Sequence, residues 1–306
     1  MSGRKKNIAM PVGTDSGVES ARAATCCLAR LHFCTDGEIA AADMSAESRA
    51  WLKAAYPGRV LRLAATRDIR AAILQRHGEA LRQEAVEGIA RRLPELSARR
   101  VLTGPQGLIL LLLGAGLLGG LLLWPLPMLR GMILALSAAF VASGLFRALL
   151  AWVGSHAPAR NLPLPRCGLP RYTILVPMYR EAAVVPGLVR ALQALDYPPA
   201  LLDIKLVLEA DDAETLAAAQ AVAPASFEIV AVPDHGPRTK PKAANYALQF
   251  ARGEYLVIYD AEDRPEPDQL LKAVAAFRAG PRTLACVQAR LNFYNADHCW
   301  LTKVLA

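Results

Sequence analysis

The sequence predicts a mostly parallel α/β domain in its C-terminal part, preceded by a transmembrane helical hairpin and by a small N-terminal α or α+β domain. Three observations predict this order. From residue 172 onward, short apolar runs alternate with segments of helical periodicity. Two long apolar runs come before them, and residues 106–160 contain no Asp or Glu. Residues 21–102, in contrast, are rich in Ala, Arg and Leu at helical spacing.

The N-terminal part divides into a tail and a small domain. Residues 1–20 are rich in Gly, Ser and charge, a composition typical of a disordered tail. In residues 21–102, apolar residues three and four positions apart predict helices over Ala46–Ala55 and Ile69–Leu93. Asp68 is placed to cap the second helix.

Residues 106–153 are expected to form two membrane-spanning helices. Gly107–Trp124 is an apolar run of 18 residues, the usual length for one bilayer crossing. Gly131–Val153 is a second run, interrupted only by Arg147, and the break between the runs, Pro125–Arg130, is short. The two spans therefore form a hairpin with both flanks on one side, and the arginines of those flanks place both soluble parts in the cytoplasm. The alternative is a buried helical hairpin of a soluble protein.

The remaining chain is expected to hold an extended linker over residues 154–170, which are rich in proline, and a partial α/β domain over residues 171–306. Apolar runs predict five strands: Tyr172–Val176, Ile204–Leu208, Phe227–Val232, Glu254–Tyr259 and Leu284–Gln288. Helices are predicted between and after them: Val185–Leu195, Ala213–Val222, Lys242–Ala251, Pro267–Ala279 and a last one from about Ala296. Such alternation is typical of a parallel sheet covered by helices on both faces.

Polar residues follow the first two strands, at the edge where open α/β sheets bind ligands. Pro177, Tyr179 and Glu181 follow the first strand, and a turn of this kind can cup a base or a ribose. The alternative is an ordinary connection that ends in a helix cap. Asp211 and Asp212 follow the second strand and suit hydrogen bonds to a uracil or a ribose. The alternative for Asp212 is to cap the next helix.

Charged residues follow the next two strands as well. Lys242 lies at the start of a predicted helix, where a basic side chain and the helix N-terminus can meet a diphosphate. The alternative is a solvated basic loop. Asp260, Glu262 and Asp263 follow the fourth strand, and Mg²⁺ or Mn²⁺ is commonly held by one or two carboxylates together with substrate phosphate oxygens. Together, these groups predict an enzyme that acts on a nucleotide-sugar.

These motifs resemble those of family 2 glycosyltransferases of the GT-A fold, in the membrane-bound group that includes bacterial cellulose synthase. The similarity extends from Tyr172 to the end of the chain. The matching segments are Ile174–Pro177, Asp211–Asp212, Lys242–Asn245, Tyr259–Asp263, Gln288–Arg290 and Asn292–Asn295. The resemblance implies that Asp211 or Asp212 contacts the uridine, that Lys242 lies near the diphosphate, and that Asp260 and Glu262 occupy the metal-binding positions.

The chain departs from the family pattern in two places. The family has Asp where this chain has Glu262, so either the longer side chain reaches the metal or Asp263 replaces it. The Thr-Glu-Asp motif that carries the family's catalytic base and the Gln-x-x-Arg-Trp motif that holds the acceptor are both missing. We therefore expect a C-terminally truncated sequence, with the base beyond Ala306, that is inactive alone.

The resulting expectation is a metal-dependent, inverting glycosyltransferase of polysaccharide biosynthesis in the bacterial inner (plasma) membrane. Its partners would be a nucleotide-sugar donor, namely a UDP-sugar, and a glycan or lipid acceptor. Basic and acidic residues nearly balance after residue 160, which argues against a nucleic-acid partner. One alternative is a non-catalytic, membrane-anchored adsorption or secretion component that retains the fold. Another is a nucleotidyltransferase, which the absence of glycine from Pro177–Glu181 disfavours.

Overall fold

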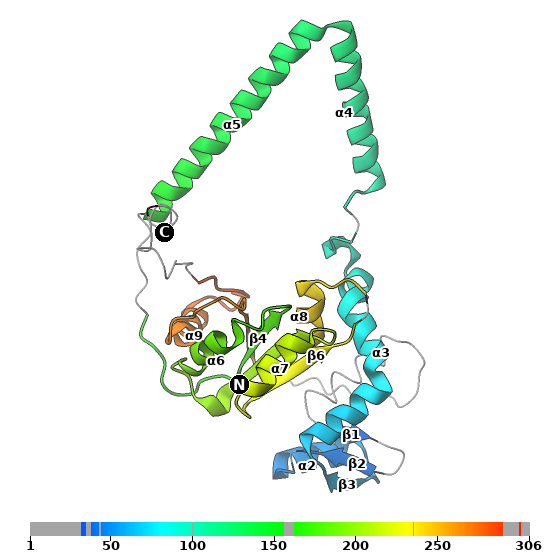
Figure 1. Cartoon of the computed structure of the whole chain (residues 1–306), viewed down its shortest axis with the longest axis vertical. Coiled ribbons are helices and arrows are strands. Elements are labelled where there is room, and N and C mark those ends of the chain that lie inside the picture. The colour runs from blue at the N-terminus through cyan, green and yellow to red at the C-terminus, as the bar shows by residue number, and fades with distance from the viewer. Residues whose placement is uncertain are drawn as a thin grey trace. The chain divides into compact units, whose positions relative to one another are not determined.

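A computed structural model describes residues 32–34, 38–42, 44–99, 101–155, 162–234, 236–289 and 300. The described residues fall into two compact units, drawn in Figure 1. One unit comprises those within Met1–Arg92 and Pro163–Ala306, and the other comprises those within Leu93–Leu162.

The first unit is built around a four-stranded parallel sheet, which confirms the expected α/β class. Its strands are β4 (Tyr172–Met178), β5 (Leu202–Glu209), β6 (Phe227–Val232) and β7 (Tyr255–Ile258), in the order β6-β5-β4-β7. Every residue of β4 is buried, as its nearly continuous apolar run requires of a central strand covered on both faces. The carboxyl ends of all four strands therefore lie along one edge of the sheet.

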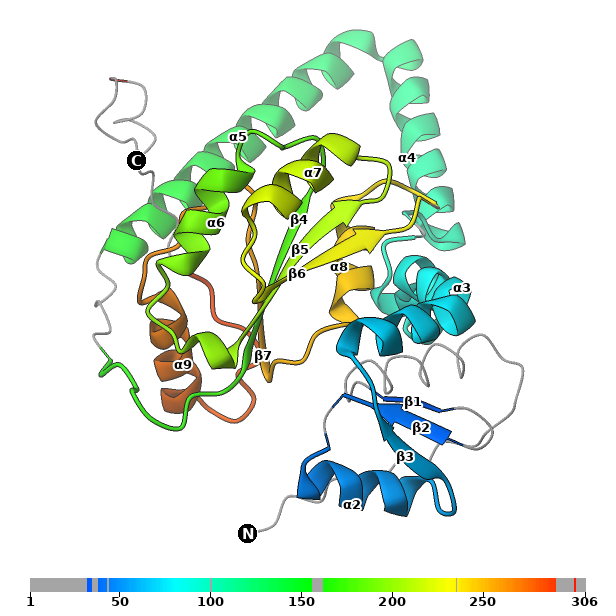
Figure 2. The same cartoon turned by 60° about the horizontal axis from the view of Figure 1, so that its bottom comes forward.

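Helices cover both faces of this sheet, as Figure 2 shows. They are α6 (Val185–Gln193), α7 (Ala213–Val222), α8 (Lys240–Leu248) and α9 (Gln269–Ala279), and a short 3₁₀ turn, η2 (Pro199–Leu201), precedes β5. Alternate residues of the central strands point into two cores. Ile174 and Leu206 pack with α6, α7 and α9, whereas Leu175 and Val207 pack with α8.

The N-terminal part of this unit carries a second, smaller sheet. Strands β1 (His32–Cys34) and β2 (Glu38–Ala41) are antiparallel, and β3 (Val60–Leu63) pairs with β2 in parallel. Helix α2 (Ala46–Ala55) has the expected bounds, and Leu52 on it packs on Ile39 and Ala41 of β2. The long helix α3 (Thr66–Arg92) begins before Asp68, which lies in its first turn and does not cap it.

Helix α3 does not belong to a separate domain, because it shares a core with the large sheet. Ile69, Ile73 and Leu81 are buried in one cluster with Val207 of β5 and Tyr246 of α8. Polar contacts cross the same interface: Asn245 Nδ2 donates to Ala85 O (3.2 Å), Gln249 Nε2 donates to Leu81 O (2.9 Å), and Arg70 pairs with Glu228. Helix α3 thus packs against α8 and supports it.

The second unit contains the two apolar helices, α4 (Gly104–Leu123) and α5 (Pro125–Ser155), after a 3₁₀ turn, η1 (Pro94–Leu96). Among the described residues, these two helices are long and apolar enough to cross a membrane, and neither is buried. The expected break at Pro125–Arg130 is wrong. Proline is tolerated in the first turn of a helix, so α5 starts at Pro125, directly after Trp124.

One expected strand of the α/β domain is wrong as well. Leu284–Gln288 is irregular, and Leu284 N donates to Pro281 O in a turn that follows α9. An apolar run forms a strand only where a neighbouring strand offers hydrogen-bonding groups, and among the described residues none pairs with this segment. The expected tail (residues 1–20), the motif Asn292–Asn295 and the helix from Ala296 lie outside the described residues, apart from the helical Trp300.

Candidate functional site

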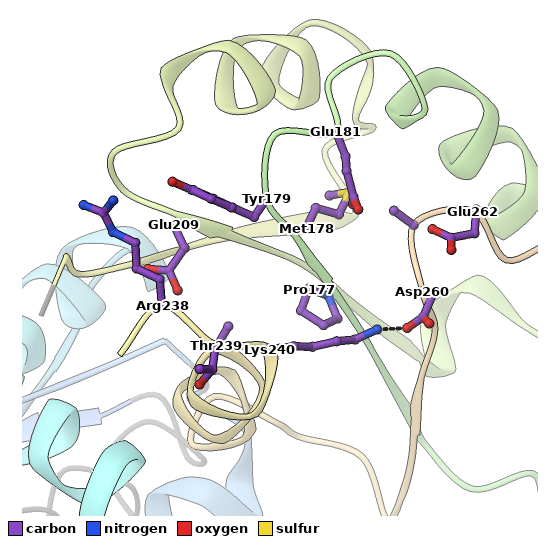
Figure 3. A pocket seen from close by; sticks show the side chains of 12 residues that line it. Pro177, Met178, Tyr179, Glu181, Glu209, Arg238, Thr239, Lys240, Asp260 and Glu262 are labelled. Carbon is purple, nitrogen blue, oxygen red and sulfur yellow. Dashed lines mark ion pairs between the residues drawn. The ribbon is translucent and has the colours of Figure 1, made fainter. Parts of the chain in front are cut away.

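A cavity of about 240 Å³ lies at the carboxyl ends of β4 and β5, beside the segment that follows β7. Figure 3 shows the side chains that line it. They are Pro177, Met178, Tyr179, Glu181, Glu209, Arg238, Thr239, Lys240, Ala243, Asp260, Ala261 and Glu262. The cavity therefore brings together residues from all four of the segments in which the sequence predicted site residues.

The turn after β4 is held in an unusual backbone conformation by Asp212. Arg180 has a φ of +58°, in the left-handed region that non-glycine residues seldom occupy. Its amide donates to Asp212 Oδ2, and the Glu181 amide donates to Thr215 Oγ1 (3.1 Å). Asp212 Oδ1 accepts from Thr215 N (3.2 Å) and so caps α7. Asp212 is thus buried beneath the turn, and it does not line the cavity.

These hydrogen bonds also set the charge of Asp212. Burial by itself would favour the neutral acid, but the donors from Arg180 and Thr215 outweigh it and hold the pKa of Asp212 below its ordinary value. The carboxylate is therefore ionised at neutral pH, and both of its oxygens are engaged by the protein. The geometry supports the helix-capping interpretation of Asp212, and Asp211 is left as the member of the pair nearer to the cavity.

Asp211 reaches the cavity through two of its lining residues. The Tyr179 hydroxyl donates to Asp211 Oδ2 (3.4 Å), and an Arg238 nitrogen lies 3.2 Å from the same oxygen. Arg238 also donates to both carboxylate oxygens of Asp234, at 3.1 and 2.9 Å. These hydrogen bonds, followed by the charge of Asp211, raise the pKa of Arg238. The Arg238 guanidinium is therefore committed to two carboxylates at the rim.

The two lysines at the start of α8 have different environments. Lys242 is buried and pairs with Glu209 at 2.9 Å (Nζ to Oε2), with 4% and 5% of the two side chains exposed. Lys240 instead lines the cavity and pairs with Asp260 across it, as the dashed line in Figure 3 marks. The sequence pointed to the basic segment Arg238–Asn245 for the diphosphate and singled out Lys242, whereas Lys240 is the lysine of this segment that lines the cavity.

Of the three carboxylates proposed as metal ligands, Asp260 and Glu262 line the cavity and Asp263 does not. Asp263 Oδ2 accepts from the Asp260 amide (2.8 Å) and so closes the turn that presents Asp260. Burial raises the pKa of Asp263, against the opposing charge of Lys240. In the part of the chain that the structure describes, no three His, Cys, Asp or Glu side chains form a ready-made metal cluster.

Glu181 supplies a further carboxylate from the opposite wall of the cavity, as Figure 3 shows. Its Oε2 atom is buried and has no hydrogen-bond partner among the described residues. Burial, and then the negative charge of Glu262, raise the pKa of Glu181. A buried carboxylate oxygen without a donor is costly, and a ligand that brings a hydroxyl or a cation would satisfy it.

The charges of the cavity do not cancel. Glu209 is neutralised by Lys242, and the single charge of Arg238 is shared by Asp211 and Asp234, two carboxylates outside the lining. The remaining lining charges are the carboxylates of Glu181, Asp260 and Glu262 and the ammonium of Lys240. This leaves a formal excess of two negative charges, which one divalent cation would neutralise. Two carboxylates with room for phosphate oxygens also fit the preference of Mg²⁺ for few protein ligands.

Comparison with known proteins agrees with this architecture. Residues 173–305 match the family model described as glycosyl transferase family 2. The chain is 28% identical over 203 residues to a probable glucomannan 4-β-mannosyltransferase of Oryza sativa subsp. japonica, a match that covers 58% of this chain and 35% of the relative. It is 29% identical over 171 residues to cellulose synthase 2 of Novacetimonas hansenii, covering 53% of this chain and 10% of the relative.

Among solved structures, a mannosyltransferase from Pyrobaculum calidifontis in complex with GDP-mannose and Mn²⁺ is similar, with 29% identity and a TM-score of 0.41. That match covers 50% of this chain and 45% of the other. The chain thus spans about a third or less of the length of the two curated relatives above. Residues 173–305 thus match glycosyl transferase family 2, and the chain is similar to glucomannan mannosyltransferases and to a cellulose synthase.

Proposed function

We propose that this chain binds a nucleotide-sugar with a divalent cation and is part of a membrane-bound glycosyltransferase that builds a polysaccharide. The observation that carries the proposal is the cavity at the strand ends, whose uncompensated charge equals that of one divalent cation. A diphosphate and a cation can enter such a cavity together, because each offsets the charge of the other.

Each wall of the cavity has a proposed part in donor binding. Pro177 and Tyr179 face the base and ribose, with Asp211 behind Tyr179 as a hydrogen-bond acceptor at the rim. Glu181 Oε2, which has no hydrogen-bond donor in the described structure, accepts a hydrogen bond from a hydroxyl of the nucleotide-sugar. Lys242 acts through Glu209, whose carboxylate it holds at the cavity wall.

Asp260 and Glu262 are the proposed ligands of Mg²⁺ or Mn²⁺, and Asp263 fixes the turn that carries them. When bound, the cation supplies Lewis-acid stabilisation of the charge that develops on the departing diphosphate. The chain's own residues hold the donor still, so that an acceptor hydroxyl can attack the anomeric carbon in line and with inversion. None of the cavity residues is assigned as the base, so donor binding is the direct readout.

The donor and the location are proposed on different grounds. A UDP-sugar is the proposed donor, as the resemblance of the site motifs to those of family 2 glycosyltransferases implies, and GDP is tested beside UDP. Helices α4 and α5 are proposed to anchor the protein in a bacterial plasma membrane, because both are long and apolar and their apolar windows contain no buried residue. Arginines flank the hairpin on both sides, so both of its flanks are proposed to face the cytoplasm.

Nucleotide binding to the full chain in detergent micelles tests the proposal. Titration calorimetry with UDP and with GDP should show affinity that depends on Mn²⁺ and is lost in Asp260→Asn. Asp196→Asn is the matched control, because Asp196 is an exposed, ion-paired carboxylate outside the cavity. Mn²⁺-dependent binding that survives in Asp260→Asn would refute the assigned metal site.

A further inference from the structure

Lys240 forms an ion pair with Asp260, the carboxylate that is proposed above as a metal ligand. Its ammonium pairs with Asp260 Oδ1, and the two side chains are 47% and 52% exposed. The pair therefore lies at the open side of the cavity, where solvent and ligands reach it. The charge of the ammonium opposes the binding of a divalent cation to the same carboxylate oxygen, because two positive charges at that separation repel each other.

The other cations near the cavity are held in place. The Arg238 guanidinium contacts Asp211 and both oxygens of Asp234, and Lys242 is buried on Glu209. Lys240 has a single ion-pair partner among the described residues, and its ammonium also acts electrostatically on Glu181 and Asp263. A lysine is a compact charge on a flexible stem, so its ammonium can move between neighbouring anions without displacing α8.

We propose that Lys240 is an exchangeable counter-cation: it neutralises Asp260 in the empty cavity, releases Asp260 to an incoming divalent cation, and then contacts the diphosphate of the donor. The inference rests on the proposed function, because it takes Asp260 as a metal ligand. It adds that the Asp260 carboxylate is paired with a cation in both states, first with the Lys240 ammonium and then with the metal. In the empty state the ammonium shields the carboxylate, and in the loaded state it contacts the phosphate oxygens that arrive with the metal.

Loss of the Lys240 ammonium should change two affinities in opposite directions, raising the affinity for Mn²⁺ and lowering the affinity for UDP. Removing the ammonium frees Asp260, so Lys240→Met should bind Mn²⁺ alone more tightly, by roughly two- to fivefold, the range for an exposed ion pair. The same variant loses a charged donor to the diphosphate, so its affinity for UDP in saturating Mn²⁺ should fall by roughly tenfold. A lysine that merely supports the fold would shift both affinities in the same direction.

The experiment measures free Mn²⁺ by electron paramagnetic resonance and UDP affinity by calorimetry, on the full chain in detergent. Lys240→Arg, which keeps the charge, should stay within about twofold of the wild type for Mn²⁺, less than the gain expected of Lys240→Met. Lys272→Met is the control for a simple loss of charge, because Lys272 is 52% exposed, pairs with Glu266 and Asp268, and does not line the cavity.

The outcomes separate this inference from the proposed function. If Lys240→Met leaves Mn²⁺ affinity unchanged or lowers it, while Asp260→Asn abolishes Mn²⁺ binding, the exchange is wrong and the metal site stands. An undiminished UDP affinity in Lys240→Met would also overturn the exchange. If Asp260→Asn binds Mn²⁺ and UDP like the wild type, the proposed function itself fails.

Discussion

Asp212 is predicted to hold the shape of the nucleotide side of the cavity, and Asp212→Asn tests this with little change of volume. The asparagine keeps one oxygen, so it can still accept from the Thr215 amide and cap α7, since Asn and Asp cap helices about equally well. Its amide nitrogen, however, replaces the oxygen that accepts from Arg180 N. A partly buried backbone donor, in a left-handed residue, would then lose its acceptor.

The size of the effect follows from that single lost contact. A hydrogen bond to a charged acceptor contributes about 1.5–3 kcal/mol. Native-state hydrogen exchange with mass spectrometry measures this locally, because opening of the turn exposes the Arg180 amide. The Arg180 amide in Asp212→Asn should therefore exchange roughly 10- to 150-fold faster than in the wild type, a factor set by the same 1.5–3 kcal/mol. The Thr215 amide should change much less.

The effect should depend on pH in a defined direction. The pKa of Asp212 is lowered in the folded state, so its contribution is complete above the ordinary pKa of 3.8 and is lost as the pH falls through the lowered value. The difference between wild type and variant should be constant from pH 7 to pH 5 and shrink in stronger acid. Asp211→Asn is the control, because Asp211 accepts no hydrogen bond from the Arg180 amide or the Thr215 amide. Unchanged exchange at Arg180 in Asp212→Asn would refute the reasoning.

Three further predictions concern the charge of Glu181 and the packing of the α/β unit. The pKa of Glu181 is raised, so the folded state holds the Glu181 proton more tightly than the unfolded state does. The stability of the wild type therefore falls as the pH rises from about 4.5 through the raised pKa. We expect Glu181→Gln to have a higher Tm than the wild type at pH 7 but not at pH 4. Gly253→Ala would place a Cβ 2.4 Å from the Thr173 amide nitrogen and should cost about 1–3 kcal/mol, whereas Gly187→Ala, on open helix surface, should be neutral or stabilising in the same denaturant titration. Ile73→Ala should lower the free energy of unfolding by about 2–5 kcal/mol and speed amide hydrogen exchange in α8, because Ile73 shares a core with that helix. Faster exchange in α3 alone would show that α3 does not stabilise α8.

The strands that could be predicted best from the sequence are those buried on both faces, because they appear as nearly continuous apolar runs. β4 and β5 are covered on both faces, so their nearly continuous apolar runs were recognised, and the carboxylates after them marked the binding edge. β1, β2 and β3 were not predicted. They have three or four residues each, and short strands of a small sheet carry too few positions for a period to emerge.

The choice between Lys240 and Lys242 shows why the site itself was harder to predict. Successive residues of a helix are about 100° apart, so two residues separated by two positions point in nearly opposite directions. Lys242 therefore turns into the protein while Lys240 turns to the cavity. The partner that holds Lys242, Glu209, is remote in sequence, and no local pattern indicates which of two basic residues will find such a partner.

The shared core of α3 and α8 could not be predicted for the same reason. The apolar spacing of α3 showed that one face would be buried, but not against which element. Only the fold shows that Leu81 O and Ala85 O of α3 accept hydrogen bonds from the side chains of Gln249 and Asn245. As a result, the segment expected to be a separate small domain supports the helix that carries Lys240.

Phosphorus hyperfine coupling to bound Mn²⁺ tests most directly whether one cation joins Asp260 to the diphosphate of a donor. The full chain is loaded with Mn²⁺ and UDP, and the ³¹P coupling is recorded by pulsed electron paramagnetic resonance. We expect a coupling of directly bound phosphate that disappears in Asp260→Asn and persists in Asp196→Asn. Bound Mn²⁺ without ³¹P coupling, or a coupling that is unchanged in Asp260→Asn, would contradict it.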